Sequence, residues 1–131
     1  MKFHHVGVFC SDITRAMSAQ ASLGMTVTWQ GFDSAQRAEI ALLTFERGEL
    51  LELIQPSEES APSYKLFKRV GPGAYHFAYA VGSLDDTGQA LRKSGCRQAG
   101  APFQAIAFGG ARAQFWFSAH VGLVELVELA A

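Results

Sequence analysis

The sequence lacks the features that mark nucleic-acid-binding, membrane and secreted proteins. It has no block of five or more basic residues and a formal net charge of −1, so charge favours neither a nucleic acid nor a membrane as partner. No apolar run approaches the roughly 18 residues that a membrane-spanning helix needs. The first residues lead directly into a strand-like segment and leave no room for a signal peptide. We therefore expect a cytoplasmic protein.

Cysteine is also scarce. Cys10 and Cys96 are the two in the chain, and they do not form the Cys-x-x-Cys pair of many metal sites. Without a secretion signal, we expect both thiols to be reduced rather than joined in a disulfide. The 131 residues, 49% of them apolar, have the length and composition of one domain with a substantial core.

What the sequence does contain is an internal repeat. Two strand-like runs surround His5 and His76, and each is followed by a turn signal and a helical stretch. The helical stretches end at Gly24 and Gly95, which are as far apart in the chain as the two histidines. Glycine is the usual stop of a helix because it tolerates positive φ. The first halves of the two copies therefore match.

The later halves of the copies match as well. Residues 49–56 and 122–129 are apolar runs with Glu52 and Glu125 at equivalent places, and each follows another strand-like run. Each copy thus reads as a strand, a helix and then about three strands. One copy of about 60 residues would bury too little surface to be stable alone.

We predict an α+β fold of two tandem βαβββ modules that form one curved mixed sheet, with a metal site in the cleft. The whole chain, residues 1–131, is then a single domain. Module one covers about residues 1–56, a connector about 57–73, and module two about 74–131. We expect the polar stretch at residues 26–37 to shape the mouth of the pocket.

Four polar residues stand inside apolar strand-like runs, at matching places in the two copies: His5, Glu52, His76 and Glu125. A carboxylate in such a run is costly to bury unless it is paired or binds a metal. Two imidazoles and two carboxylates suit one divalent ion per chain, such as Co²⁺, Ni²⁺, Mn²⁺, Zn²⁺ or Fe²⁺. The alternatives are a hydrogen-bonded core histidine and a glutamate turned to solvent by a one-residue change of register. The symmetric set of four favours the metal.

The neighbours of the two histidines follow from the alternation of side chains along a strand. Strict alternation places Phe3 on the face of His5, and Tyr75 on the face opposite His76. His4 has no counterpart in the second copy, and we interpret it as a surface or loop residue.

These segments resemble the vicinal oxygen chelate superfamily over essentially the whole chain. The branch that they look most like is methylmalonyl-CoA epimerase; other branches include glyoxalase I, extradiol dioxygenases and antibiotic-resistance binding proteins. Six segments carry the resemblance to the metal-binding strands, connecting helix and glycine-rich loop of the epimerase branch. They are His4-His5-Val6-Gly7-Val8, residues 49–56, residues 65–69, Tyr75-His76, residues 109–112 and residues 123–126. The resemblance implies a divalent metal, often a homodimer, and a small-molecule substrate such as a CoA or glutathione thioester.

The chain departs from the family pattern in two places. The helix expected at residues 13–23 lacks the aromatic pair common in the family. Pro56 stands where glyoxalase I commonly has a polar group that helps to hold glutathione. These departures weaken the likeness to glyoxalase I.

The quartet suits removal of a proton next to a carbonyl, because a divalent metal is a Lewis acid and carboxylates are available as bases. Glu125 is our first candidate base, and Glu52 is its counterpart in the other copy. A base on each side of a planar enolate would allow epimerisation. Glu39 is a third candidate, since it resembles a non-ligand glutamate of some epimerases, but a charge at a strand edge is an equally good interpretation.

Candidate substrate-binding residues lie in two segments. Arg112, beside Gly109 and Gly110, could hold a substrate carboxylate or be a solvated loop arginine. Lys68, with Lys65 and Arg69 on one helix face, could attract the phosphates of CoA or form a solvated stripe. We favour the solvated interpretation for both segments.

Three functions compete. The first is epimerisation of methylmalonyl-CoA or a similar 2-acyl thioester. The second is a glyoxalase I-like lactoylglutathione lyase, which needs the same quartet. The third is a binding or resistance protein without catalysis. Extradiol dioxygenases use two histidines and one carboxylate, so the second glutamate argues against that branch.

Overall fold

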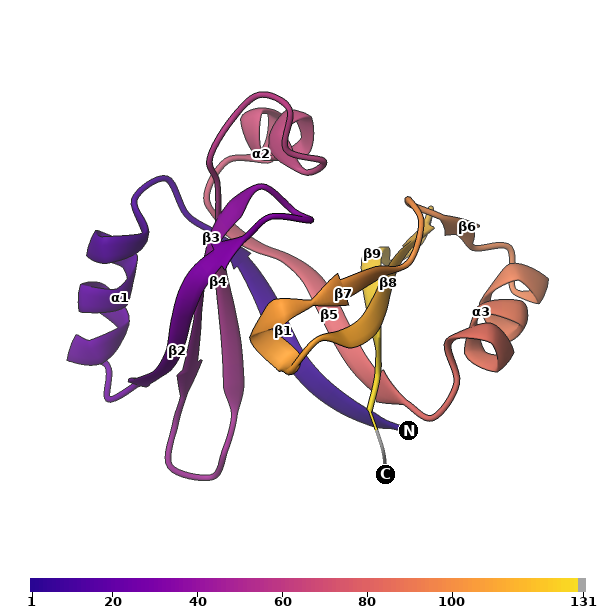
Figure 1. The fold of residues 1–131 in the computed structure, drawn as a ribbon, viewed down its shortest axis with the longest axis horizontal. Helices are drawn as coiled ribbons and strands as arrows, with labels where there is room; N and C mark the ends of the chain where they lie inside the picture. The colour runs from indigo at the N-terminus through magenta and orange to yellow at the C-terminus, as the bar shows by residue number, and fades with distance from the viewer. Residues whose placement is uncertain (130–131) are drawn as a thin grey trace.

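The computed structural model describes residues 1–129 and places nine strands in one curved, mixed sheet, with α1 and α3 on its outer face (Figure 1). The elements in chain order are β1 (Lys2–Phe9), α1 (Ile13–Ser22), β2 (Thr26–Asp33), β3 (Ala38–Thr44), β4 (Leu50–Pro56), α2 (Tyr64–Val70), β5 (Gly73–Val81), α3 (Leu84–Lys93), β6 (Arg97–Gln98), β7 (Phe103–Ala105), the 3₁₀ turn η1 (Ile106–Phe108), β8 (Ala111–Ser118) and β9 (Gly122–Glu128). The predicted connector thus carries α2.

The sheet confirms the predicted α+β class and the two-module arrangement. Its strand order is β2-β3-β4-β1-β5-β9-β8-β6, with β7 also paired to β8. In each module the first strand pairs with the last in parallel, β1 with β4 and β5 with β9, and the next strands follow antiparallel. β1 and β5 pair antiparallel and so join the modules at the centre of the sheet. The second module differs in one respect, because a strand equivalent to β2 is replaced by the short β6 and β7.

The two outer helices begin and end as the sequence predicts. Asp12 caps α1 by accepting a hydrogen bond from the Arg15 amide at 3.1 Å, and Ser83 caps α3 in the same way. Beyond their C-termini, Gly24 and Gly95 take φ values of 94° and 91°, which favour glycine.

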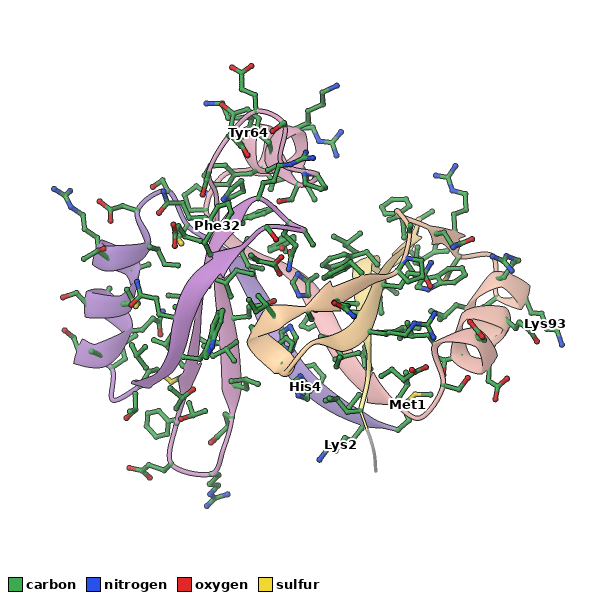
Figure 2. All side chains as sticks on the ribbon, in the orientation of Figure 1. Met1, Lys2, His4, Phe32, Tyr64 and Lys93 are labelled. Atoms are coloured by element: carbon green, nitrogen blue, oxygen red, sulfur yellow. The ribbon has the colours of Figure 1, made fainter. Side chains whose placement is uncertain are left out.

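Apolar side chains fill both faces of the sheet. Ile13 of α1 packs on Leu43 and Leu53, while Leu84 of α3 packs on Trp116 and Leu126. The inner face carries a third cluster around Phe9, over which α2 lies with Tyr64 at its start (Figures 1 and 2). Both cysteines are free thiols, as expected. Within residues 1–129, no helix combines the length and apolarity needed to cross a bilayer.

Two β-bulges lie in the central pair of strands. The register between β1 and β5 shifts on either side of His4 and again at Tyr75, so each residue is an extra one in its strand. Phe3 therefore packs against Tyr79, with ring centroids 5.7 Å apart, and Tyr75 stacks on Phe9 of the inner face at 3.5 Å. The alternation prediction is wrong for Phe3 and Tyr75 because each bulge reverses the facing of the residues beyond it. The interpretation of His4 is also wrong: it lies in β1, and Tyr75 is its counterpart.

Candidate metal centre

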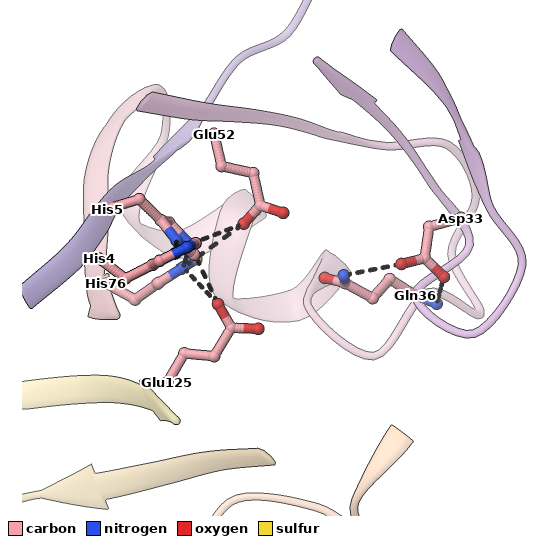
Figure 3. A network of polar contacts seen from close by, with 7 residues as sticks. All are labelled: His4, His5, Asp33, Gln36, Glu52, His76 and Glu125. Atoms are coloured by element: carbon pink, nitrogen blue, oxygen red, sulfur yellow. Dashed lines mark hydrogen bonds and ion pairs between the residues drawn. The ribbon is translucent and has the colours of Figure 1, made fainter. Parts of the chain in front are cut away.

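The four predicted ligands come from the four central strands of the sheet, β4, β1, β5 and β9 (Figure 3). Two rows of paired residues explain why they meet. In one row Gly7 of β1 lies between Glu52 and His76; in the other, Ala78 of β5 lies between His5 and Glu125. Each row is ligand, small residue, ligand, so the larger side chains lean over the gap between them. A Cβ atom on Gly7 would lie 1.9 Å from Cε1 of His76, which shows that the imidazole occupies this gap.

The ligand atoms form a close cluster. Nε2 of His5 lies 3.2 Å from Oε1 of Glu52 and 3.1 Å from Oε1 of Glu125. Nε2 of His76 lies 3.6 and 3.3 Å from the same oxygens, and the two Nε2 atoms are 3.3 Å apart. All four ligand atoms lie within 4.8 Å of one another, and no side chain of the four is more than 3% exposed.

This donor set fits a divalent cation. Ligand atoms bound at about 2.0–2.2 Å stand about 3.0–3.5 Å apart in octahedral or tetrahedral arrangements, which is close to the separations observed. Protein groups alone do not satisfy the cluster, since Oε1 of Glu52 and Oε1 of Glu125 are buried without a hydrogen bond among residues 1–129. Neutral imidazoles can direct lone pairs at the same point as the carboxylates only around a cation.

The electrostatics of the ion-free cluster distinguish the two glutamates. Burial acts to raise the pKa of Glu125, but its close contacts with the His5 and His76 rings lower it to about 2. Burial raises the pKa of Glu52, and the contact with His5 does not offset it. Burial acts to lower the pKa of His5, but its contacts with Glu125 and Glu52 raise it to about 9. Glu52 is therefore the carboxyl that takes up a proton more easily.

Three aromatic side chains surround the histidines. Phe108 of η1 stacks on His5, with centroids 5.0 Å apart, and Phe115 of β8 meets His76 edge-on at 5.1 Å. Tyr75 also meets the His76 ring edge-on, at 4.5 Å. These rings hold the imidazoles in place and keep their surroundings apolar.

The structure does not bring Glu39 to the cluster. Glu39 pairs with Gln55 of β4, whose side chain accepts a hydrogen bond from the Ile13 amide at the start of α1. Glu39 thus lies on the outer face of the sheet, whereas Leu42, the partner of Glu52, lies on the inner face.

Of the predicted substrate-binding residues, Arg112 faces the outer side of the sheet and Lys68 faces solvent, whereas Gly109 and Gly110 follow Phe108, which stacks on His5. Arg112 pairs with Glu128 at 3.7 Å, and Glu128 caps α3 on the outer face. Gly109 and Gly110 form the turn between η1 and β8, with φ values of 67° and 82°. Lys68 is exposed on α2, with Nζ 5.8 Å from the ring centroid of Tyr64, in agreement with the solvated interpretation.

A cleft of about 340 Å³ opens beside the quartet between the two modules. None of its described lining residues carries a charge; they include Gln36, Leu66, Tyr75, Phe103, Phe115 and Leu123. As expected, the stretch at residues 26–37 contributes to it, through Ala35 and Gln36.

A buried pair, Asp33 and Gln36, was missed by the sequence analysis. Asp33 accepts hydrogen bonds from the Ala35 and Gln36 amides at 2.9 and 3.1 Å, and from Nε2 of Gln36 at 3.0 Å. The Gln36 carboxamide oxygen is left turned toward the quartet (Figure 3). An aspartate at the end of a strand is a turn signal, but the sequence does not indicate that its carboxylate accepts a hydrogen bond from the Gln36 side chain.

Comparison with known proteins agrees with this geometry. A sequence profile of the glyoxalase/bleomycin resistance protein/dioxygenase superfamily matches residues 4–115. The chain belongs to this superfamily. A comparison with curated protein sequences finds no significant match.

Solved structures narrow the likeness within the superfamily. A methylmalonyl-CoA epimerase from Mycobacterium tuberculosis is 28% identical, with a TM-score of 0.85 over 99% of this chain and 89% of that one. A hypothetical protein from Bacillus halodurans is 25% identical, with a TM-score of 0.85 over 99% and 95%. A variant of the Streptomyces coelicolor methylmalonyl-CoA epimerase, in complex with 2-nitronate-propionyl-CoA, is 25% identical, with a TM-score of 0.84 over 100% and 96%. The predicted superfamily resemblance is confirmed.

Proposed function

We propose that the chain is a divalent-metal-dependent enzyme that removes a proton next to a carbonyl, and that it epimerises methylmalonyl-CoA or a similar 2-acyl thioester. The observation that carries the proposal is the convergence of His5, Glu52, His76 and Glu125 on one buried point. A bound divalent ion would supply Lewis acidity that stabilises negative charge on a substrate oxygen. The likeness to two methylmalonyl-CoA epimerases supports the choice of substrate.

The two glutamates are the proposed proton-transfer groups. They lie on β4 and β9, on opposite sides of the β1–β5 pair, so a planar enolate between them would have a carboxyl toward each face. Glu52, whose pKa is raised by burial, is suited to take up and return a proton. Glu125, whose pKa is lowered to about 2 by its contacts with the two histidines, is the carboxylate that would accept the substrate proton on one face while Glu52 returns a proton to the other. Glu39 stays a prediction from resemblance that its outer-face position does not support.

The cleft supports a CoA thioester over a glutathione one. Its described lining residues are uncharged, which suits the neutral amide chain next to the sulfur of a CoA thioester. Glutathione would bring two carboxylates to the described lining, which has no cationic side chain to meet them, whereas the one carboxylate of methylmalonyl-CoA is on the reacting carbon, where a bound divalent ion would meet it. The homodimer and the cytoplasmic location stay predictions from the sequence.

The test begins with protein purified without a metal-chelating tag. We expect about one divalent ion per chain, and loss of that ion in His76→Ala. Solvent deuterium should enter methylmalonyl-CoA in the presence of wild-type protein, and exchange should fall steeply in Glu52→Gln and Glu125→Gln. Glu39→Gln is the matched control, and we expect it to exchange at the wild-type rate.

Other outcomes decide between the competing functions. Turnover of a methylglyoxal–glutathione hemithioacetal in place of exchange would replace the epimerase with the lyase. Wild-type protein that binds no ion after reconstitution with cobalt, nickel, manganese or zinc would remove both enzymes and leave a binding protein.

A further inference from the structure

His4 makes a contact that the repeat does not duplicate. Its Nδ1 atom lies 2.8 Å from Nδ1 of His5, a good hydrogen-bond distance between two ring nitrogens. The bulge at His4 makes the contact possible, because it turns two consecutive side chains toward the same region. Phe108 holds both rings: it stacks on His5 and meets His4 edge-on, each at 5.0 Å between centroids. Figure 2 shows His4 beside the turn that carries this phenylalanine.

The direction of this hydrogen bond follows from the surroundings of His5. Nε2 of His5 faces the carboxylate oxygens, so it either donates to them or uses its lone pair as a ligand. When Nε2 is a metal ligand, the hydrogen atom of the neutral His5 ring is on Nδ1, and Nδ1 donates it. Nδ1 of His4 accepts, and the hydrogen of the His4 ring is then on its Nε2.

The second ligand histidine lacks such support. Nδ1 of His76 is buried and has no hydrogen-bond partner among residues 1–129. Tyr75, which occupies the place of His4 in the second module, stacks on Phe9 and does not bond to the His76 ring. The quartet is symmetric in its ligands but not in the groups that support them.

We propose that His4 is a positioning residue that fixes the tautomer and orientation of His5 as a metal ligand. The inference rests on the proposed metal centre. A second group that accepts the free N–H of a ligand imidazole keeps its other nitrogen directed at the ion and makes that nitrogen a stronger donor. The unsupported His76 is then the more easily displaced of the two imidazoles.

Three variants separate this role from a packing role. His4→Phe retains a ring against Phe108 but removes the acceptor. His4→Asn removes the ring but restores an acceptor, because the asparagine Oδ1 stands where Nδ1 of histidine stands. Tyr75→Phe changes the equivalent position of the other module and leaves the His76 ring nitrogens untouched.

Metal-free wild type and variants are titrated with Co²⁺ against a chelating competitor, with the visible spectrum of the cobalt protein recorded. We expect His4→Phe to lower affinity about 10- to 100-fold and to alter the cobalt bands, which is the usual effect of losing such a partner. His4→Asn should recover most of the affinity, and Tyr75→Phe should match wild type. In the zinc-loaded protein, NMR should detect the Nδ1–H of His5 in wild type and His4→Asn, and lose it to solvent exchange in His4→Phe.

Wild-type affinity and spectrum in His4→Phe would overturn the inference, as would an equal loss in His4→Phe and His4→Asn. Thermal unfolding of the metal-free variants shows whether each is folded. Wild-type protein that binds no cobalt would overturn the proposed metal centre together with this role. Activity is not part of the readout, so failure of the epimerase reaction leaves the outcome decisive.

Discussion

Substitution of Gly7 by alanine tests the geometry of the metal centre with a single methyl group. A Cβ atom at this position would lie 1.9, 2.2 and 2.4 Å from Cε1, Nδ1 and Nε2 of His76, where ordinary contacts are 3.4 Å or more. The backbone of Gly7 does not have positive φ, so alanine introduces no conformational strain of its own. The imidazole of His76 must move by more than about 1 Å, which takes its Nε2 atom out of the cluster.

The expected loss follows from the number of ligands. If a four-ligand site is worth roughly 10–16 kcal/mol, one ligand contributes about 3 kcal/mol, and each 1.4 kcal/mol is a factor of ten. Gly7→Ala should therefore weaken Co²⁺ binding by about 100-fold or more, measured by competition with a chelator. The free energy of unfolding of the metal-free protein should fall by about 1–3 kcal/mol from overpacking.

Two other glycines provide matched controls. A Cβ on Gly88 of α3 would lie 2.8 Å from Cζ2 of Trp116 on the outer face of the sheet, so Gly88→Ala should affect stability and leave metal affinity unchanged. A Cβ on Gly82 would meet nothing within 4 Å, so Gly82→Ala should be silent in both assays. Unchanged cobalt affinity in Gly7→Ala would refute the assignment of His76 as a ligand held in the gap over Gly7.

Three further predictions follow from the quartet and its surroundings. In the metal-free protein the pKa of His5 is raised to about 9, so its ion pairs stabilise the fold fully below pH 6.5 and are lost as the pH rises through 9; urea unfolding across this range should show a loss of about 3 kcal/mol, absent with saturating zinc. Metal at about 1,000 times its Kd should add about 4 kcal/mol and raise Tm by roughly 15 °C in calorimetry, and no shift on chelation would argue against the site. Asp33→Ala should cost about 2 kcal/mol in chemical unfolding because two backbone amides and Gln36 lose their acceptor, whereas Asp33→Asn should cost less; equal costs would contradict this account.

The modules and the quartet could be predicted from the sequence because both depend on the internal repeat, whose two copies take equivalent positions in the fold. Glu52 and Glu125 stand out among apolar neighbours, because burying a carboxylate in such a run is costly unless it is paired or binds a metal. The four residues form a matched set because the repeat that relates His5 to His76 also relates Glu52 to Glu125. The nine-stranded sheet confirms the fold predicted from the repeat, and the family profile confirms the superfamily that the motifs resemble.

The predictions that placed side chains on faces were weaker, for a physical reason. Alternation gives the facing of a residue only while the strand is regular, and one extra residue reverses it. The bulges at His4 and Tyr75 produced the errors for Phe3 and Tyr75. The face on which Glu39 lies depends on the register in which β3 pairs with β4 across the turn at residues 45–49. The strand propensities of the residues do not specify that register.

The two bulges also explain how a symmetric fold produces a site with two different sides. Between the bulges β1 and β5 keep a single register, in which His5 and Gly7 meet Ala78 and His76, and this short stretch aligns the two rows of ligands. On the His5 side, Phe108 and His4 cover the imidazole. On the His76 side, Tyr75, Phe115 and Leu123 line the cleft instead. Because Tyr75 and Phe115 contact His76 and line the cleft, whereas neither Phe108 nor His4 is among its described lining residues, a substrate in the cleft should approach past His76, the imidazole without a supporting acceptor.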